Sequence, residues 1–534
     1  MSGGTLAVTL DGAEAIASDP DTDRVLIVGL ADRSVTAVSL RPGDEPGRVV
    51  VDDHRRAHVA LRRGGAVVTL ELDSRTITAR REVCRLPRGL AWDPVEEVLH
   101  VACAGGELVT LPTGDGPPTR TVRLERDLRD VVVHGNRLYV TRFRSAEVLV
   151  LDEGGAVVGR ARADLPRTAA SVAWRAVPSP RGGLWLLHQR VGDAPVALTA
   201  AGYYSSHVTY CTGTEAIARP GLAWVRPPAE VRVLPELPFA PLAVDVAAAP
   251  SAERLAVAIP GNWGSAERPQ VIETSTEPSP VCMRLTPYTV PRGQVVAVAY
   301  GAEGALWVQT RAPATLVRLS DRTVIELGGP AMEHAGHRLF HSQPAGLMTC
   351  ASCHPEGGDD GRNWTFAGLG IRRTQNLLGG VLETAPFHWD GDLMDFSALL
   401  GEVMVRRMRA RAPSPSESNA LERWVDALPP LPASDRGAAA ARGEALFRSE
   451  AVGCAGCHSG RAYTNGQTVA VGTGGPFQVP TLRGLAWRAP YMHNGCAATL
   501  RDRFGPCGGG EAHGHTAHLL PAQLEDLLAF LESL

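Results

Sequence analysis

The sequence predicts a multi-domain chain in which a β-propeller of seven blades is followed by two small α-helical domains in tandem. Two observations predict this architecture. Short apolar runs recur across residues 1–330, separated by turns rich in Gly, Asp and Pro. From about residue 331 the pattern changes to amphipathic, helix-like stretches, and two segments of this C-terminal part repeat each other. A chain of 534 residues is also too long for one hydrophobic core, so several domains are expected.

The N-terminal part contains seven apolar runs, each long enough for one strand and most of them 30 to 50 residues apart. Several are followed, after a turn, by a second strand-like run, which is typical of propeller blades. Leu138-Tyr-Val-Thr-Arg142 also resembles the Tyr-Val-Thr-Asn repeats of one propeller class. A pair of β-sandwiches is the alternative. The seven runs are Val25–Gly29, His58–Leu61, Leu99–Cys103, Leu138–Thr141, Leu184–Leu187, Leu255–Ala258 and Leu306–Gln309.

The C-terminal part contains four helix-like stretches, at Gly336–Phe340, Ser416–Leu428, Arg442–Phe447 and Pro521–Leu534. Ser416 is the expected N-cap of the second stretch, and Pro429-Pro430 ends it. These signals place the propeller at residues 1–330, the first helical domain at 331–432 and the second at 433–534.

Each helical domain contains one Cys-x-x-Cys-His motif, the pattern of c-type haem attachment. The first is Cys350-Ala-Ser-Cys353-His354, and the second is Cys454-Ala-Gly-Cys457-His458. The two thiols of each motif can add to the vinyl groups of one porphyrin, and the histidine can bind its iron. The sequence therefore predicts two covalently bound haem c groups, with His354 and His458 as proximal iron ligands.

Both motifs belong to a longer repeat. Gly336-His-Arg-Leu-Phe340 precedes the first motif, and Gly443-Glu-Ala-Leu-Phe447 precedes the second. Downstream, Ala385-Pro-Phe-His-Trp-Asp-Gly391 has its counterpart in Ala489-Pro-Tyr-Met-His-Asn-Gly495. The repeat predicts two tandem cytochrome c domains.

At these residues the chain resembles the bacterial di-haem cytochrome c peroxidase family, which includes the methylamine-utilisation di-haem enzyme. The resemblance covers roughly residues 331–534. It implies that Trp389 relays electrons between the haems. It also implies one calcium ion between the domains, bound by the Asn376 side chain and by the backbone carbonyls of Arg488 and Pro490. Oxygen ligands of this kind suit calcium.

The chain departs from that family at the first haem. The family has a glutamate, just before a methionine, that helps to cleave peroxide, and here Arg407 precedes Met408. Because a positioned acid contributes strongly to such chemistry, we expect weak peroxidase activity unless Asp390 or Glu402 substitutes. Met408, or alternatively Met404, is a possible second iron ligand that would close this haem.

The second haem also lacks the usual distal ligand. The segment after Thr499-Leu500, where the family places a methionine or tyrosine, contains neither. It offers His513 as the first choice of ligand and His515 as the second, beside glycines that allow the backbone to approach a porphyrin. A solvated loop with unused histidines is the alternative. For His388, Met492 and His493 a structural role is favoured.

Six cysteines remain outside the two motifs, an even number that suits disulfides in an oxidising compartment. We expect Cys496 to pair with Cys507, and Cys84 can pair with Cys103 across adjacent strands. For Cys211 and Cys282, reduced buried thiols are as plausible as a disulfide.

Composition and charge exclude some partners. The formal net charge is −4 and no long basic run occurs, so nucleic acid is not an expected partner. No apolar stretch is long enough to span a membrane. The first ten residues do not read as a signal peptide. Because haem c is attached outside the cytoplasm, we nevertheless expect a periplasmic or extracellular protein whose export signal is absent from this sequence.

The expected function is electron transfer between two haems, with peroxide reduction or partner oxidation at the first. The partners would be a redox protein or a small electron donor, and an unknown ligand of the propeller. The alternative is a propeller-based binding or surface protein. Its di-haem part would then conduct electrons or sense the redox state, and it would catalyse no reaction of its own.

Overall fold

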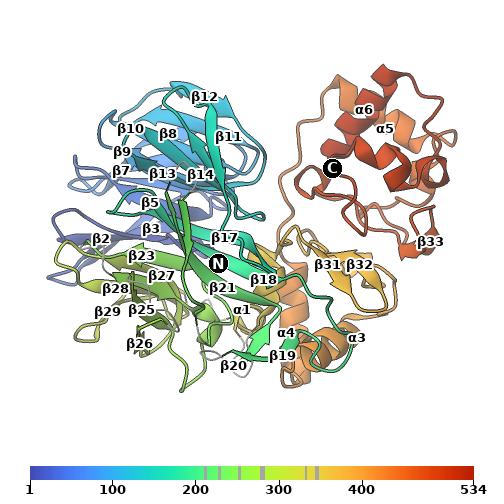
Figure 1. Ribbon diagram of the computed structural model, residues 1–534. Helices are drawn as coiled ribbons and strands as arrows, with labels where there is room; N and C mark the ends of the chain where they lie inside the picture. Colours follow the sequence, from blue (N-terminus) through green and yellow to red (C-terminus); the bar gives the residue numbers. More distant parts are fainter. Residues whose placement is uncertain are drawn as a thin grey trace. The chain divides into compact units, whose positions relative to one another are not determined.

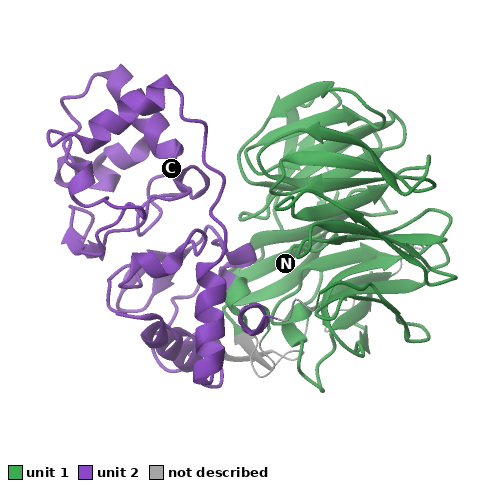
Figure 2. Cartoon of the chain, turned by 180° about the vertical axis from the view of Figure 1, so that it is seen from behind, with its two compact units in different colours: residues 1–193, 205–333, 341–352 green, residues 194–204, 334–340, 353–534 purple. Residues whose placement is uncertain are grey.

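The computed structural model describes residues 1–209, 213–226, 230–237, 239–250, 254–276, 283–330, 334–342 and 348–534. Contacts divide the chain into two compact units (Figure 2). The first contains residues 1–193, 205–333 and 341–352, and the second contains residues 194–204, 334–340 and 353–534. Cys211 and Cys282 lie outside the described residues.

The first unit is a seven-bladed β-propeller, as the sequence predicted (Figure 1). Each blade is an antiparallel sheet whose four strands follow one another along the chain, except that blade 5 carries an inserted hairpin. Blade 1 contains β1 (Leu6–Val8), β2 (Glu14–Asp19), β3 (Arg24–Gly29) and β4 (Val35–Ser39). Blade 2 contains β5 (Pro46–Val51), β6 (Arg56–Leu61), β7 (Ala66–Glu71) and β8 (Thr76–Glu82). Blade 3 contains β9 (Pro87–Asp93), β10 (Val98–Cys103), β11 (Glu107–Pro112) and β12 (Arg120–Arg123).

The remaining blades follow the same order. Blade 4 contains β13 (Leu128–His134), β14 (Arg137–Arg142), β15 (Val148–Leu151) and β16 (Val157–Ala161). Blade 5 contains β17 (Thr168–Pro178), β18 (Leu184–Gly192), β21 (Ala218–Arg226) and β22 (Glu230–Val233), with the hairpin β19 (Tyr204–Thr209) and β20 (Gly213–Ala216). Blade 6 contains β23 (Asp245–Ala248), β24 (Arg254–Ala258), β25 (Val271–Ser275) and β26 (Leu285–Tyr288). Blade 7 contains β27 (Gln294–Tyr300), β28 (Leu306–Arg311), β29 (Thr315–Arg318) and β30 (Thr323–Glu326).

The seven apolar runs are not equivalent strands. Six of them form the second strand of their blade, whereas Val25–Gly29 lies in β3, the third strand of blade 1. The reason is that both middle strands of blade 1 are buried, and β3 is the more apolar of the two. The number of blades was therefore predicted correctly, although the apolar run of blade 1 marks its third strand and those of the other blades mark the second.

The propeller ring closes through side chains, because its first and last blades exchange no strand. Apolar side chains of blades 1 and 7, among them Leu26 and Trp307, share one core. The Thr5 hydroxyl donates to Gln309 at 2.7 Å, and the Gln309 amide donates to the carbonyl of Ser18 at 2.8 Å.

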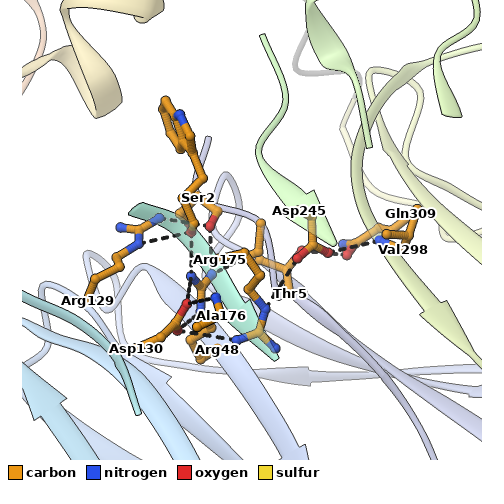
Figure 3. Close-up of polar contacts among 12 residues, drawn as sticks. Ser2, Thr5, Arg48, Arg129, Asp130, Arg175, Ala176, Asp245, Val298 and Gln309 are labelled. Atoms are coloured by element: carbon orange, nitrogen blue, oxygen red, sulfur yellow. Dashed lines mark hydrogen bonds and ion pairs between the residues drawn. The ribbon is translucent and has the colours of Figure 1, made fainter. Parts of the chain in front are cut away.

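A buried ionic network joins the innermost strands of several blades (Figure 3). Arg48 of β5 contacts Asp130 of β13 at 2.7 Å, and Arg175 of β17 lies 3.3 Å from both Asp130 and Asp245. Arg48 also donates to the carbonyl of Ser2, at 2.6 Å. The two carboxylates are thus paired although they are almost completely buried, as buried charges must be.

The second unit repeats one arrangement of helices. In its first half, α1 (Ala335–His341) crosses α4 (Pro415–Asp426), and in its second half α5 (Ala438–Arg448) crosses α6 (Pro521–Glu532). A side chain at Gly336 would collide with the backbone of Ala420, and one at Gly443 with that of Asp526. The repeated glycine therefore permits the close helix crossing in both halves.

Between these helices each half contains short elements in the same order. The first half has α2 (Cys350–Cys353), the first three residues of which are assigned to the first unit. It continues with η2 (Pro355–Gly357), β31 (Asn363–Phe366), β32 (Gly370–Arg373), η3 (Val381–Thr384), α3 (Phe396–Leu399) and the π-helix η4 (Leu400–Arg407). The second half has η5 (Cys454–Gly456), β33 (Thr468–Ala470), β34 (Pro476–Gln478), η6 (Leu485–Trp487), η7 (Asp502–Phe504), η8 (Pro506–Gly508) and η9 (Gly510–His513).

The N-cap of α4 is a correction to the sequence analysis. Ser414, not Ser416, caps the helix, and its hydroxyl accepts from the backbone N–H of Glu417 while the Glu417 carboxylate accepts from that of Ser414. Pro415 lies at the first helical position, where its missing N–H costs nothing. The proline thus opens the helix and does not precede it.

Candidate haem-binding sites

The histidine of the second motif is held with one ring nitrogen free for a metal. His458 Nδ1 lies 3.1 Å from the carbonyl oxygen of Tyr463. A carbonyl can only accept, so Nδ1 carries the hydrogen and Nε2 keeps its lone pair. Cys454 and Cys457 form no disulfide. This arrangement, with one ring nitrogen bonded to a backbone carbonyl, is the usual support of a metal-binding histidine.

The first motif shows the same geometry. His354 Nδ1 lies 3.1 Å from the carbonyl oxygen of Gly358, which leaves Nε2 as the ligand atom. Cys350 and Cys353 are also free of disulfides, and they lie one helical turn apart at the two ends of α2. Both predicted proximal histidines therefore present the same nitrogen.

The structure brings His513 beside His458. Their ring centroids are 6.2 Å apart and their planes differ by 32°. A nitrogen ligand lies about 2.0 Å from a metal ion and about 1.1 Å from the centroid of its own ring, so imidazoles on opposite sides of one iron have centroids roughly 6.2 Å apart. His513 Nδ1 lies 3.0 Å from the carbonyl oxygen of Gly508, which again leaves Nε2 free. The spacing accommodates one metal ion between two neutral imidazoles.

His515 is placed differently. Its side chain is 67% exposed and lies 3.9 Å from the Glu511 carboxylate. Among the two histidines that the sequence offered, the geometry therefore favours His513.

A disulfide closes the loop that precedes η9, the short helix that carries His513. Cys496 is bonded to Cys507, as the sequence predicted. The guanidinium of Arg503 donates to the carbonyl of His513. The Arg503 contact thus ties the end of η9 to η7.

The predicted disulfide between Cys84 and Cys103 is also present. It does not join neighbouring strands of one sheet. Cys84 follows β8 of blade 2, and Cys103 ends β10 of blade 3, so the bond links two blades.

A polar cluster surrounds Arg407 at the end of η4. The guanidinium lies 2.9 Å from Glu402 and also forms a hydrogen bond with the phenol of Tyr203. Glu402 forms a second ion pair with Arg406 at 3.0 Å, and Asp390 is paired with Arg372 at 2.9 Å. Both acids that could replace the family's glutamate are therefore engaged by arginines.

The methionines of this region are buried. Met404 and Met408 are 5% and 4% exposed. The backbone carbonyl of Met408 accepts a hydrogen bond from the hydroxyl of Tyr204 at 3.1 Å. A role of either thioether as an iron ligand stays a prediction.

Sequence reasoning missed Tyr203. The residue lies in the insertion between β18 and β19, about 150 positions before the first motif. Nothing in the local sequence distinguishes it from a surface tyrosine. Only the path of the chain brings it to Arg407.

Trp389 lies where the two halves of the second unit meet. Its indole N–H donates to the carbonyl of Arg373 at 2.6 Å, and its ring lies 6.3 Å from that of His493. His493 in turn stacks on Phe477 at 3.8 Å. The tryptophan and its repeat counterpart His493 thus face each other.

The two halves exchange hydrogen bonds in a symmetric way. The backbone N–H of Arg373, at the end of β32, donates to His493, and that of Gln478, at the end of β34, donates to Trp389, at 2.6 and 2.7 Å. Each half therefore binds the Ala-Pro turn of the other half. His388 and Met492, which occupy equivalent places in these turns, both have positive φ.

The side chains of Asn376 and Arg488, two of the residues predicted to bind calcium, already have hydrogen-bond partners within the protein. Asn376 Nδ2 donates to Asp359 at 3.0 Å, and its Oδ1 accepts from the backbone N–H of Leu378 at 2.9 Å. The Asp359 carboxylate is also paired with Arg373 at 2.8 Å. Arg488 is buried and directs its guanidinium to the carbonyls of Thr481 and Arg483, away from its own carbonyl. The predicted calcium ligands are all neutral oxygens. The charge of the Asp359 carboxylate, which accepts from Asn376, is balanced by Arg373.

Within the described part of the chain, no cluster of three or more His, Cys, Asp or Glu side chains is arranged to bind a metal ion. No helix among the described residues is long and apolar enough to cross a membrane.

Comparison with known proteins identifies the C-terminal domain. Residues 440–534 match the Cytochrome c family. The chain is 27% identical over 256 residues to hydrazine synthase subunit gamma of Kuenenia stuttgartiensis, a match that covers 35% of this chain and 72% of that protein. It is 45% identical over 67 residues to the cytochrome-c peroxidase IdrP1 of Denitromonas iodatirespirans, covering 11% of this chain and 18% of that protein.

Among solved structures, the hydrazine synthase of Kuenenia stuttgartiensis is similar at a TM-score of 0.49 and 16% identity, and the match covers 60% of this chain and 96% of that chain. The family match shows that residues 440–534 form a cytochrome c domain, which implies covalently bound haem c.

Proposed function

We propose that the protein is a di-haem c-type cytochrome that transfers electrons between two haems, one in each half of the second unit. The observation that carries the proposal is the repeated histidine geometry. His354 and His458 each follow a Cys-x-x-Cys pair and each give their Nδ1 hydrogen to a backbone carbonyl. When bound, the haems supply one-electron redox chemistry, and the protein supplies attachment, axial ligands and orientation.

The two halves are proposed as tandem cytochrome c domains at residues 331–432 and 433–534, after a propeller at 1–330. Both halves have the same helix crossing at a glycine, the same hairpin and the same Ala-Pro turn. This duplication supports a haem in the first half, which the cytochrome c match at 440–534 does not reach.

In this proposal Cys350, Cys353, Cys454 and Cys457 anchor the porphyrins. Trp389 is the relay, because its indole contacts the backbone of Arg373, and the Arg373 N–H contacts His493 of the other half. A continuous path of covalent and hydrogen bonds therefore connects the two halves.

The second haem is proposed to have two histidine ligands, His458 and His513. Methionine as an axial ligand raises the reduction potential, so a pair of imidazoles should give a lower one. The second haem is accordingly an electron-transfer centre closed to substrate.

The first haem is the proposed place of turnover, with peroxide reduction or oxidation of a partner as the reaction. The similarity to a cytochrome-c peroxidase and to a hydrazine synthase subunit supports redox chemistry at such a centre. The electron donor would be a redox protein or a small molecule.

A binding or wiring protein is the second candidate. The complete seven-bladed propeller favours it, since propellers commonly serve as binding platforms and a fold does not determine function. The two candidates differ at the first haem. An enzyme requires one open coordination position on the iron of that haem. A protein that only binds partners and conducts electrons would have two haems whose irons are six-coordinate.

One calcium ion is a further part of the proposal, bound by Asn376 Oδ1 and the carbonyls of Arg488 and Pro490. Because no free carboxylate joins this set, binding should be weak, and elemental analysis of the purified protein tests it. A location outside the cytoplasm is also proposed, since haem c attachment and the two disulfides both suit it.

Haem stoichiometry tests the proposal. Protein matured in a bacterial periplasm should have the mass of the chain plus two haems. The variant Cys350→Ala/Cys353→Ala should lose one haem and keep the His458–His513 spectrum, and Cys454→Ala/Cys457→Ala should lose the other. A mass with one haem would contradict the di-haem proposal, and an unmodified mass would contradict haem attachment altogether.

A further inference from the structure

The side chain of Arg503 reaches from η7 to the short helix that carries His513. Its guanidinium donates to the backbone carbonyl of His513. The guanidinium carbon also lies 4.7 Å from the ring centroid of Phe504, the next residue in the chain. A hydrogen bond and a ring contact therefore fix the charged end of this long side chain.

The chain around His513 lies directly beside the second Cys-x-x-Cys-His motif. The backbone N–H of His515 donates to the carbonyl of Val452 at 2.9 Å. A side-chain carbon placed on Gly514 would lie 3.7 Å from Cys454 Sγ and 3.9 Å from Arg503 Nη2. The guanidinium and the first thiol of the motif thus both border Gly514, so Arg503 belongs to the second haem site.

One nitrogen of this guanidinium has no partner. Arg503 Nη1 is buried and forms no hydrogen bond within the part of the chain that the structure describes. Buried donors are nearly always paired, so an orphaned one marks a place where a group other than the protein is expected. A haem fits this place, because the motif's thiols are free of disulfides and His513 faces His458 at the spacing of two axial ligands.

The charge of Arg503 is not held in an ion pair. Among the described residues, no carboxylate forms one with it. Glu511, the acid of the neighbouring η9, instead accepts from the backbone N–H groups of Thr516 and Ala517 at 3.0 and 2.8 Å. Burial lowers the pKa of Arg503, but a guanidinium remains protonated at neutral pH. The second haem site therefore contains a fixed positive charge.

We propose that Arg503 is the cation that raises the reduction potential of the second haem. The inference rests on the proposed function and deepens it, because it adds a group that sets the potential to the two proposed ligands. A positive charge in a medium of low dielectric constant favours the iron state with one electron more. Two imidazoles lower the potential relative to a histidine and a methionine, and Arg503 would offset part of that decrease.

A redox titration of the complete di-haem protein tests the inference. The second haem is followed through the low-spin electron paramagnetic resonance signal of its two histidine ligands. Arg503→Met removes the charge and keeps a long, apolar side chain. At the midpoint potential of the wild-type haem, this substitution should lower the ratio of reduced to oxidised second haem by about 10-fold, which corresponds to about 59 mV for a one-electron centre.

Two further variants separate the charge from the shape of the side chain. Arg503→Lys keeps a cation that can donate a hydrogen bond, and it should restore most of the wild-type potential. Arg501→Met is the matched control, because Arg501 is an exposed arginine two residues away that is paired with Glu525, and its loss should leave the potential unchanged. The low-spin signal should persist in all three variants, since the carbonyl of Gly508 still holds the His513 ring.

The possible outcomes are distinct. Equal potentials in wild type and Arg503→Met would overturn the inference. A decrease of the same size in Arg503→Lys would also overturn it, because the charge would then not be the cause. A high-spin signal in both Arg503 variants would show that the residue only holds the loop, which again contradicts the inference. Absence of haem at Cys454 and Cys457 by mass spectrometry would instead show that the proposed function fails.

Discussion

At the scale of single residues, the second motif is distinguished by the imidazole that lies beside its histidine. His458 faces another imidazole at a spacing that fits one metal ion. In the first half, a separate polar cluster contains Arg407, Glu402 and Tyr203. A neutral nitrogen donor suits iron coordination, whereas a guanidinium cannot coordinate a metal. The imidazole pair thus supports the proposal that the second haem has two histidine ligands.

The residue pair His513 and His515 provides a direct test. His513→Ala should convert the low-spin, bis-histidine spectrum of the second haem into a high-spin or water-ligated one, because the imidazole beside His458 is lost. His515→Ala removes an exposed imidazole two residues away and should leave the spectrum unchanged. Optical and electron paramagnetic resonance spectra measure both. If the spectrum is lost only in His515→Ala, the ligand assignment is wrong, and if neither variant changes it, this loop provides no ligand.

At the scale of elements, the short helices η7, η8 and η9 depend on cross-links because they contain few buried apolar side chains. The disulfide between Cys496 and Cys507 closes a loop that contains η7 and the start of η8, and Gly508 lies where any side chain would collide with the backbone of Arg503. The segment that positions His513 is therefore stabilised by covalent and steric constraints more than by packing.

Removing this disulfide should destabilise the second haem site. Cys496→Ala/Cys507→Ala should lower the free energy of unfolding of the haem-binding unit by about 2–3 kcal/mol, the chain-entropy value for a short closed loop. Urea titration followed by haem absorbance measures it. Cys84→Ala/Cys103→Ala is the control, since it removes a disulfide between two propeller blades and should leave the second haem's spectrum intact. Free thiols at Cys496 and Cys507 in the oxidised protein would exclude the bond.

At the scale of the whole molecule, the propeller must close its ring without an exchanged strand. The network of Figure 3 contributes to closure because Arg48, Asp130 and Asp245 come from the innermost strands of three blades. Arg48 and Arg175 hold the pKa of Asp130 at about 2 in spite of its burial. The folded protein therefore binds this proton more weakly than the unfolded chain does.

The sign of the pH dependence follows from that lowered pKa. The stability that Asp130 contributes is fully present above the pKa of an unfolded aspartate, about 3.9, and is lost as the pH falls through about 2. Asp130→Asn leaves the buried guanidinium of Arg48 without the carboxylate that it contacts and should cost about 3–5 kcal/mol at neutral pH. The difference from wild type should shrink between pH 4 and pH 2.

Thermal unfolding of both proteins across this pH range measures the effect. Asp321→Asn is the control, because the ion pair of Asp321 with Arg318 is partly exposed and its loss should change stability far less. A constant difference between wild type and Asp130→Asn down to pH 2 would show that the Asp130 charge is not the cause.

The sequence alone determined the features that depend on neighbours along the chain. These are the seven strand-rich blades, the two Cys-x-x-Cys-His motifs, the repeated Gly-x-x-Leu-Phe and Ala-Pro segments, and the short disulfide between Cys496 and Cys507. Each has a local cause, such as the reach of a side chain, a turn, or a glycine at a helix crossing. The histidine-rich loop was likewise visible, although the sequence could not choose between His513 and His515 by geometry.

Only the tertiary structure decided which distant groups meet. Three contacts join residues more than 80 positions apart. Tyr203 contacts Arg407, and Arg48 pairs with Asp130. The backbone carbonyls of Trp389 and His493 each accept a hydrogen bond from the hairpin of the opposite half. No local pattern identifies such partners, because an arginine or tyrosine has the same propensities whether it faces solvent or a buried charge. The choice is made by the path of the backbone, which brings the groups together and removes the water that would otherwise satisfy them.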